Sequence, residues 1–288
     1  MQLLKVFSAL SVTALLASAP AGAQSDDSAR LAYEKELAAE RPIEGIGSIW
    51  LEELTWMEVR DALAAGTTTI IIPTGGIEQN GPYLALGKHN YVLEESCEAI
   101  ARKLGDALCA PILKLVPEGD IDEPSGHMLY PGTISMRQET YQAILTDIAE
   151  SLETHGFRDI VFIGDSGGNQ NGMEAVAKEM NAQWKDARAH FVPEYYRSYF
   201  DGFDLLKDEF GVEQTTDEGI HDDIVITSLM LTGDPETVRY RQRLAAGKAS
   251  INGVSLEDLP AIRSIGNAVL KYRAEKTAAA IELARERN

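Results

Sequence analysis

Residues 69–89 read TIIIPTGGIEQNGPYLALGKH. The isoleucines predict a short strand buried on both faces, and a helical pattern begins just after His89. A loop at the carboxyl end of such a strand is where open α/β sheets bind ligands. Glu78 and His89, near the two ends of this loop, are its side chains best suited to proton transfer or metal binding. Glycines and prolines between them predict a compact turn that brings the two together.

Strand and helix patterns alternate along the chain. Such alternation through mostly short loops favours a largely parallel sheet covered on both faces. We therefore predict one three-layer α/β/α domain over residues 46–288. Further strands are expected at Leu108–Val116, Asp159–Gly164 and Ala189–Pro193. Helices are expected after a capping box at Thr55 and Glu58, over Asn90–Leu104, after a cap at Ser135, over Met173–Trp184 and His221–Leu231, and from Ala261.

The N-terminal residues have the features of an export signal. Lys5 precedes the apolar run Val6–Ala19, and Ala21-Gly22-Ala23 forms an A-x-A cleavage site. The run of about 14 apolar residues is shorter than the roughly 20 that span a bilayer. We therefore expect a signal peptide at 1–23, an arm or linker at 24–45, and a periplasmic or secreted mature protein.

The net charge limits the kinds of binding partner, and the cysteine content raises the question of a disulfide. A formal net charge of −19 repels phosphate backbones and anionic lipids, so we expect neither nucleic acid nor membrane as a partner. The two cysteines, Cys97 and Cys109, both fall in buried patterns. Two buried thiols are favoured, and a disulfide stays open in an exported protein.

Four ordered blocks resemble the creatininase (creatinine amidohydrolase) family. They are Glu-Gln-x-Gly-Pro-x-Leu-x-Leu-Gly in the first loop, His127 followed by Tyr-Pro-Gly-Thr-Ile-Ser (130–135), Gly-Asp-Ser-Gly-Gly-Asn (164–169), and the stretch 221–231. The resemblance implies a creatininase-like fold and a homo-oligomer, often a hexamer. It also implies hydrolysis of a C–N bond, in an amide or cyclic amide of a small molecule, at two divalent metals.

The positions that the resemblance assigns to metal ligands are altered. Glu78 matches a family glutamate, but the other positions hold residues that the family does not use: Asn80 and Ser166 for histidines, His89 for a bridging aspartate, and Ile224 and Ile226 for glutamates. Amide, hydroxyl and aliphatic groups are poor replacements for these ligands. We therefore expect the usual two-metal centre to be missing, with one divalent ion, Zn²⁺ or Mn²⁺, or none.

Two hydrolytic schemes and one non-catalytic alternative remain open. The resemblance implies that Glu78, His89 and Ser166 meet in one cavity. In one scheme Glu78 and His89 hold a single ion, with Asp165 or His221 and water completing its coordination. In the other, without metal, Glu78 orients His89, which deprotonates Ser166. The alternative is a periplasmic ligand-binding pseudoenzyme.

Further residues are assigned to the site with less direct chemistry. The resemblance places His221 at a histidine that acts on substrate or in proton transfer, so we count it as catalytic. Tyr83, His127, Gly167 and Asn169 are assigned to substrate binding, and the backbone N–H groups of the glycine-rich turn are candidates for an oxyanion hole. Capping of that turn is favoured over metal binding for Asp165. An aromatic-rich segment at 195–203 is expected to cover the pocket, meet another subunit or pack internally.

Overall fold

The computed structural model describes residues 27–214, 221–251 and 253–287. The predicted signal peptide at 1–23 lies outside these ranges. The chain divides into two compact units, Met1–Glu44 and Gly45–Asn288. In the first unit, helix α1 spans Asp27–Leu37, inside the segment predicted to be an arm or linker. The site described below lies entirely in the second unit.

A parallel four-stranded sheet organises the second unit. Strands β1 (Thr69–Thr74), β2 (Ala107–Cys109), β3 (Asp159–Gly164) and β4 (Arg188–Phe191) lie in the order β2-β1-β3-β4. Every pair in this sheet is parallel, and Thr74 at the end of β1 is in register with Gly164 at the end of β3. The loops that follow these two strands therefore start side by side at one edge.

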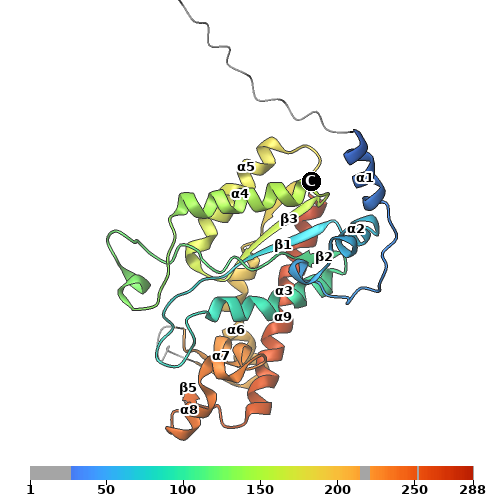
Figure 1. Cartoon of the computed structure of the whole chain (residues 1–288). Coiled ribbons are helices and arrows are strands. Elements are labelled where there is room, and N and C mark those ends of the chain that lie inside the picture. The colour runs from blue at the N-terminus through green and yellow to red at the C-terminus, as the bar shows by residue number, and fades with distance from the viewer. Residues whose placement is uncertain (1–26, 215–220, 252, 288) are drawn as a thin grey trace, which may run out of the picture. The chain divides into compact units, whose positions relative to one another are not determined.

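Helices cover both faces of this sheet, which confirms the predicted three-layer α/β fold (Figure 1). Helices α4 (Gln138–Thr154) and α5 (Gln170–Gln183) pack on one face, where Ile70, Ile72 and Phe162 are buried. Helices α3 (Lys88–Leu104), α6 (Glu194–Phe210) and α9 (Leu259–Glu286) cover the other face, over Ile71 and Val161. Alternate isoleucines of β1 thus point into opposite cores, as expected for a strand buried on both sides.

A third apolar cluster packs the segment that precedes α9 against the first half of α9. It contains Val225, Leu229, Val238, Ile251 and Val269. The elements here and elsewhere in the unit are η1 (Leu51–Glu53), α2 (Trp56–Ala64), η2 (Gly126–Leu129), η3 (Gly167–Asn169), α7 (Ile224–Met230), η4 (Pro235–Val238), α8 (Tyr240–Ala245), β5 (Ser250–Ile251) and β6 (Val254–Ser255). Within the described residues, no helix combines the length and apolarity needed to cross a bilayer.

The expected strand at Leu108–Val116 is wrong beyond Cys109. Pro111 has no N–H to donate to a ladder, so regular pairing stops before it. Past this point the segment makes only isolated bridges, including one from Val116 to Ser135. Strand β4 also ends early, at Phe191, and the aromatic segment after it is helix α6.

Of three predicted helix starts, one is confirmed and two are corrected. The capping box of Thr55 and Glu58 is present at α2. Ser135, predicted to cap α4, instead donates to the Gly119 carbonyl and accepts from the Glu118 N–H, and α4 begins at Gln138 without a side-chain cap. The helix predicted from His221 begins three residues later, at Ile224.

The preference for two buried thiols is wrong, because Cys97 and Cys109 form a disulfide. Cys97 lies on the buried stripe of α3, and this stripe packs against β2, where Cys109 ends the strand. Their Cα atoms are 6.3 Å apart, within the range that a disulfide spans. The bond fixes α3, whose first turn carries site residues, to the edge of the sheet.

Candidate active site

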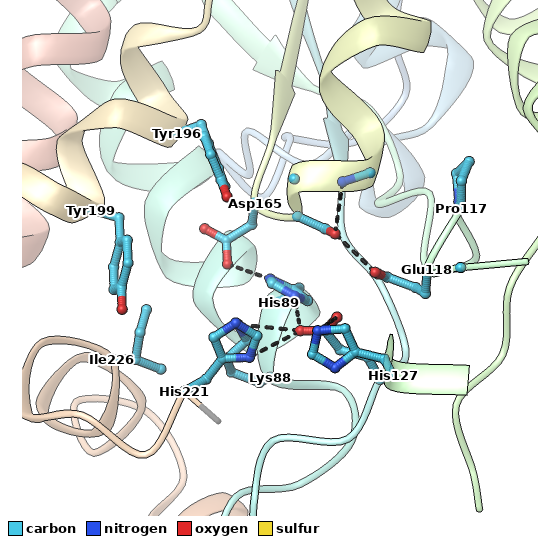
Figure 2. A pocket seen from close by; sticks show the side chains of 15 residues that line it. Lys88, His89, Pro117, Glu118, His127, Asp165, Tyr196, Tyr199, His221 and Ile226 are labelled. Atoms are coloured by element: carbon cyan, nitrogen blue, oxygen red, sulfur yellow. Dashed lines mark hydrogen bonds and ion pairs between the residues drawn. The ribbon is translucent and has the colours of Figure 1, made fainter. Parts of the chain in front are cut away.

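A cavity of about 300 Å³ lies at the carboxyl ends of β1 and β3 (Figure 2). Three carboxylates and three imidazoles share it with one lysine, so it concentrates groups that hold metals or move protons. Its lining residues are Glu78, Lys88, His89, Pro117, Glu118, Gly119, His127, Asp165, Ser166, Gly167, Gly168, Tyr196, Tyr199, His221 and Ile226.

Glu78, His89 and Asp165 form a buried chain of hydrogen bonds. His89 Nε2 lies 2.7 Å from Glu78 Oε1, and His89 Nδ1 lies 2.8 Å from Asp165 Oδ2. Ionised carboxylates only accept hydrogen bonds, so both ring nitrogens of His89 donate. The structure therefore brings Glu78 and His89 together across the loop, and it places the imidazole between two acids.

Asp165 is anchored to the scaffold. Its Oδ1 accepts from Arg273 Nη2 at 2.9 Å and from the Tyr195 hydroxyl at 3.1 Å, while Oδ2 faces His89. Burial alone would raise the pKa of Asp165, but the charge of Arg273 and the contact with His89 hold it well below its usual value. Both oxygens are thus engaged, which argues against the predicted role of Asp165 as a metal ligand. The turn after β3 is capped by Ser166, not by Asp165.

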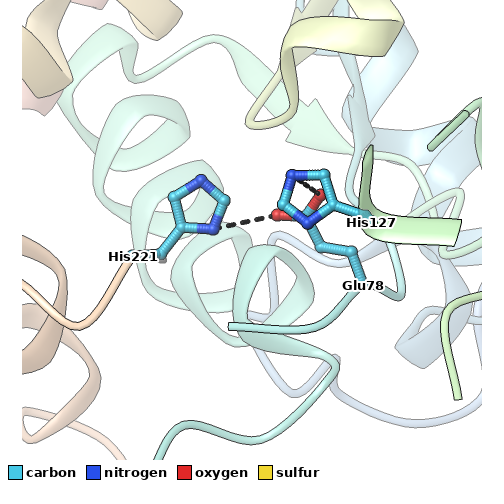
Figure 3. A group of neighbouring side chains, drawn as sticks. All are labelled: Glu78, His127 and His221. Carbon is cyan, nitrogen blue, oxygen red and sulfur yellow. Dashed lines mark ion pairs between the residues drawn. The ribbon is translucent and has the colours of Figure 1, made fainter. Parts of the chain in front are cut away.

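Glu78 is also approached by two further histidines (Figure 3). His221 Nδ1 lies 3.0 Å from Glu78 Oε1, and His127 Nε2 lies 3.4 Å from Glu78 Oε2. Burial opposes ionisation, yet the hydrogen bonds of His221 and His89 and the charge of Lys88 hold the pKa of Glu78 far below normal. A single carboxylate is therefore the centre on which three imidazoles converge.

The turn before α7 presents His221 to Glu78. His221 has a φ of 62°, in the left-handed region that non-glycine residues rarely adopt. Its Nδ1 also lies 2.9 Å from Asn80 Oδ1, and the Asn80 amide is itself fixed because its Nδ2 donates to the Glu78 carbonyl. The next residue, Asp222, is buried and bound by Arg243 at 2.9 Å. Burial lowers the pKa of His221.

Ser166 points to Glu118 and not to His89. Its hydroxyl donates to Glu118 Oε2 at 2.9 Å, while both nitrogens of His89 are taken by Glu78 and Asp165. The predicted scheme in which His89 deprotonates Ser166 is therefore not the arrangement of this site. Burial and the negative charge of Glu78 raise the pKa of Glu118 to about 9. Its Oε1 is buried and has no hydrogen-bond partner among the described residues.

Two glycines make room for the segment that delivers Glu118. A Cβ on Gly76 would lie 1.9 Å from Glu118 Oε1, and a Cβ on Gly168 would lie 2.0 Å from the Pro117 carbonyl oxygen. The irregular segment from Pro117 is thereby held between the β1 loop and the glycine-rich turn. Sequence reasoning did not assign Glu118 to the site, and the available signal was the pair of glycines, Gly76 and Gly168, that leaves space for its segment.

Lys88, the residue before His89, is a second functional group that sequence reasoning missed. Its side chain is only 3% exposed, and its Nζ lies 3.7 Å from Glu78 Oε1. Burial lowers the pKa of Lys88, against the opposing charges of Asp165, Glu78, Asp223 and Glu118. A lysine inside an otherwise buried motif loop is the signal that could have identified it.

The residues assigned to substrate binding separate into two pairs. His127 and Gly167 line the cavity. Tyr83 and Asn169 do not belong to its lining in the described chain. The Tyr83 ring lies under the Arg243 guanidinium, 4.2 Å from its centroid, and buried Asn169 donates to the Thr74 carbonyl and hydroxyl oxygens. Both therefore hold loops in place.

The aromatic segment contributes one wall. Tyr196 and Tyr199 of α6 line the cavity together with Ile226 of α7 (Figure 2). Tyr195, one residue earlier, is fully buried against Arg273. Of the three roles considered for this segment, lining the pocket and packing internally are both present.

The cavity combines buried acids and imidazoles at the ends of parallel strands. Together with the relatives described next, this arrangement identifies an amidohydrolase-type hydrolase. The family model of creatininase, described as creatinine amidohydrolase, matches residues 52–280. The chain therefore belongs to the creatininase family, as its sequence blocks predicted.

Individual relatives agree with this assignment. The chain is 26% identical to creatinine amidohydrolase of Pseudomonas putida over 197 residues, which cover 66% of this chain and 74% of the relative. It is 28% identical to 3-dehydro-scyllo-inosose hydrolase of Thermotoga maritima over 194 residues, 65% of this chain and 57% of that protein. A solved structure entitled creatininase Mn superposes with a TM-score of 0.60 at 22% identity, covering 82% of this chain and 98% of that one. This last likeness shows the fold.

The residues present fit one divalent ion whose ligands differ from the predicted set, because His127 takes the place predicted for His89. Ligand atoms of Glu78, His127 and His221 lie within 4.8 Å of one another, and two imidazoles with a carboxylate suit Zn²⁺. His127 Nδ1 lies 3.2 Å from the Gln79 carbonyl and 3.5 Å from the Gln79 side-chain Nε2, and a neutral ring that donates from Nδ1 to the carbonyl leaves Nε2 available to an ion. With this tautomer the Nε2 lone pair faces Glu78 Oε2, and a divalent ion held by these two residues would satisfy both acceptors. A second group, Glu78, His89 and Glu118, fits less well because His89 already bridges two acids.

Proposed function

We propose that the protein hydrolyses a C–N bond, in an amide or cyclic amide of a small molecule, with one divalent ion held by Glu78, His127 and His221. The observation that carries the proposal is the convergence of His127 and His221 on opposite oxygens of buried Glu78 in the cavity. Family membership supports the reaction class. A bound ion would polarise the substrate carbonyl and lower the pKa of a bound water.

The protein's own groups prepare this chemistry. Glu78 stays ionised because His89 and His221 hydrogen-bond to it and Lys88 lies nearby, so it keeps a negative charge for the ion. His89 is locked between Glu78 and Asp165, so it orients Glu78 and does not act on Ser166. One wall of the cavity is formed by Tyr196, Tyr199 and Ile226. A small substrate would displace water from this apolar surface.

Amide hydrolysis also moves one proton from the attacking water to the leaving nitrogen. The Glu118 carboxyl is suitably placed to carry it, because it lies beside Glu78 and His89 and one of its oxygens has no partner in the described chain. Ser166 holds the other oxygen and so positions the carboxyl. In this scheme Ser166 is a positioning residue and not the nucleophile.

Elemental analysis of the purified protein, paired with turnover of a panel of small amides and cyclic amides, tests the proposal. We expect one equivalent of a divalent metal, loss of that metal in His127→Ala, and no labelling of Ser166 by a fluorophosphonate. Ser166 labelling without metal would restore the serine scheme. Binding of panel compounds with neither metal nor turnover would favour the ligand-binding pseudoenzyme.

We infer that the protein works after export, in a periplasm or outside the cell. The disulfide between Cys97 and Cys109 supports this location, since such bonds persist in oxidising compartments. Fractionation of cells that express the full chain, with N-terminal sequencing of the product, tests it. A cytoplasmic product that keeps residues 1–23 would contradict the inference.

We also infer a homo-oligomer, with the hexamer of the family resemblance as the expected size. Large apolar side chains that are exposed in the segment 129–134 and at Leu86, which lies against Gly132, support it, namely Leu86, Leu129, Tyr130 and Ile134. Exposed apolar groups of this number gathered in one region are typical of protein interfaces. Light scattering of the wild type and of Leu129→Glu tests it, and a wild-type monomer would contradict it.

A further inference from the structure

Lys88 is the cationic group of the cavity that the proposed mechanism leaves unused. It begins α3, and its side chain is 3% exposed although the residue lines the cavity. Across the described ranges its Nζ makes no hydrogen bond, and its ion-pair contact there is with Glu78 Oε1 at 3.7 Å. An ammonium has three donors and no acceptor, so all three are available to a ligand.

A comparison with Arg273 shows how unusual this is. Arg273, equally buried, donates to Asp165 Oδ1 at 2.9 Å and to the Ser198 hydroxyl at 3.3 Å. Burying a charge without such partners costs free energy. Lys88 therefore does not serve as a structural cation in the way that Arg273 does.

We propose that Lys88 binds the substrate oxygen that gains negative charge during hydrolysis, so that the cavity recognises an oxyanion. This inference rests on the proposed function. When water adds to the carbonyl carbon, the π pair moves onto the oxygen, and the N–H groups of Lys88 are placed to receive it. When the pair returns, the C–N bond breaks and the nitrogen takes the proton that the water lost.

The charge pattern of the cavity favours this oxygen over a permanent substrate carboxylate. Glu78 and Asp165 are ionised and line the same space, so a permanent anion that Lys88 does not contact meets their repulsion. An oxygen that is neutral in the substrate avoids this repulsion on entry. Its interaction with Lys88 then strengthens as the negative charge develops, which is the condition for lowering a barrier.

Calorimetric titration with methylphosphonate, a tetrahedral anion, and with neutral acetamide tests this role in zinc-loaded and chelator-treated protein. Lys88→Met removes the charge and keeps the side-chain length. Lys103→Met, on the exposed last turn of the same helix, makes the same change in net charge. We expect Lys88→Met to bind methylphosphonate at least about tenfold more weakly, as for loss of a charge-assisted hydrogen bond. Lys103→Met should bind it as the wild type does, and acetamide binding should change little in either variant.

Unfolding by urea supplies the second readout. Lys88→Met should be at least as stable as the wild type, because it removes a buried ammonium that lacks hydrogen bonds. A wild type that does not bind methylphosphonate, a Lys88→Met variant that binds it equally well, or one that loses stability together with affinity would each overturn the inference. Lys88-dependent binding in protein that takes up no metal would support the inference while contradicting the proposed function.

Discussion

Asp165 and Glu78 are both buried acids in contact with His89, yet their surroundings differ. Asp165 is held by Arg273 of α9 and Tyr195 of α6, and both helices belong to the scaffold. Glu78 lies in a loop and faces His127 and His221, which come from the short helix η2 and from the turn before α7. We call Asp165 with Arg273 and Tyr195 the scaffold half of the site, because these contacts maintain the fold. We call Glu78 with His127 and His221 the ligand half, because these residues are organised around the ligand.

The scaffold half should show the largest effect on stability. Arg273→Met leaves Asp165 buried without its cation, and breaking a buried pair costs about 3–5 kcal/mol. Arg102→Met, which breaks the exposed pair with Glu98, should cost no more than about 1 kcal/mol. Urea unfolding monitored by circular dichroism measures both. Equal costs for the two variants would remove the distinction between the halves.

Exchange of each acid for its amide should separate the halves by a different readout. Glu78→Gln removes a proposed ligand, and we expect zinc affinity to fall by more than about 100-fold, beyond the effect of losing an outer-shell partner. Asp165→Asn should keep zinc binding and lose stability instead. Competition with a chromogenic chelator measures the affinity. Zinc loss in Asp165→Asn with zinc retained in Glu78→Gln would reverse the account.

Gly76→Ala should disturb the ligand half more mildly. Its new Cβ meets Glu118 Oε1 at 1.9 Å, and overpacking of this kind costs about 1–3 kcal/mol. Gly87→Ala, in the same loop, is the control because its nearest contact is 3.5 Å. Combining Gly76→Ala with Glu118→Ala should recover part of the loss in a double-mutant cycle. A purely additive pair would show that Glu118 does not occupy this space.

The smallest effect expected is the change in stability per pH unit in chelator-treated protein. The pKa of Glu118 is raised from 4.5 to about 9, so its contribution is complete below pH 4.5 and is lost as pH rises towards about 9. The pKa of Asp165 is lowered, so its contribution is present above 3.8 and is lost as pH falls. Unfolding free energies of Glu118→Gln should therefore fall less steeply between pH 5 and about 9 than those of the wild type. Parallel profiles would contradict a raised pKa in Glu118.

The sequence contained enough to predict the scaffold that places Glu78 and His89. The three isoleucines of β1 and the capping box at Thr55 are local sequence patterns. Such patterns predict secondary structure without knowledge of the tertiary contacts. The family blocks placed His127 and His221 near the cavity. They did not show that both would face Glu78, because this depends on how separate loops turn.

Other contacts could not be predicted because they join distant segments without a local signature. Arg273 meets Asp165 across 108 residues, from the middle of a long helix. Ser166 meets Glu118 across 48 residues, in an irregular segment whose path is set by glycines at 76 and 168. The disulfide was misjudged because burial patterns do not show which buried positions face each other.

Anomalous diffraction at the zinc edge, from crystals of the wild-type protein grown with zinc, tests the central claim most directly. The account predicts one strong peak between Glu78, His127 and His221, with His89 still bridging Glu78 and Asp165. A peak on Asp165, or zinc absent from the cavity while His127 and His221 keep their contacts to Glu78, would contradict it.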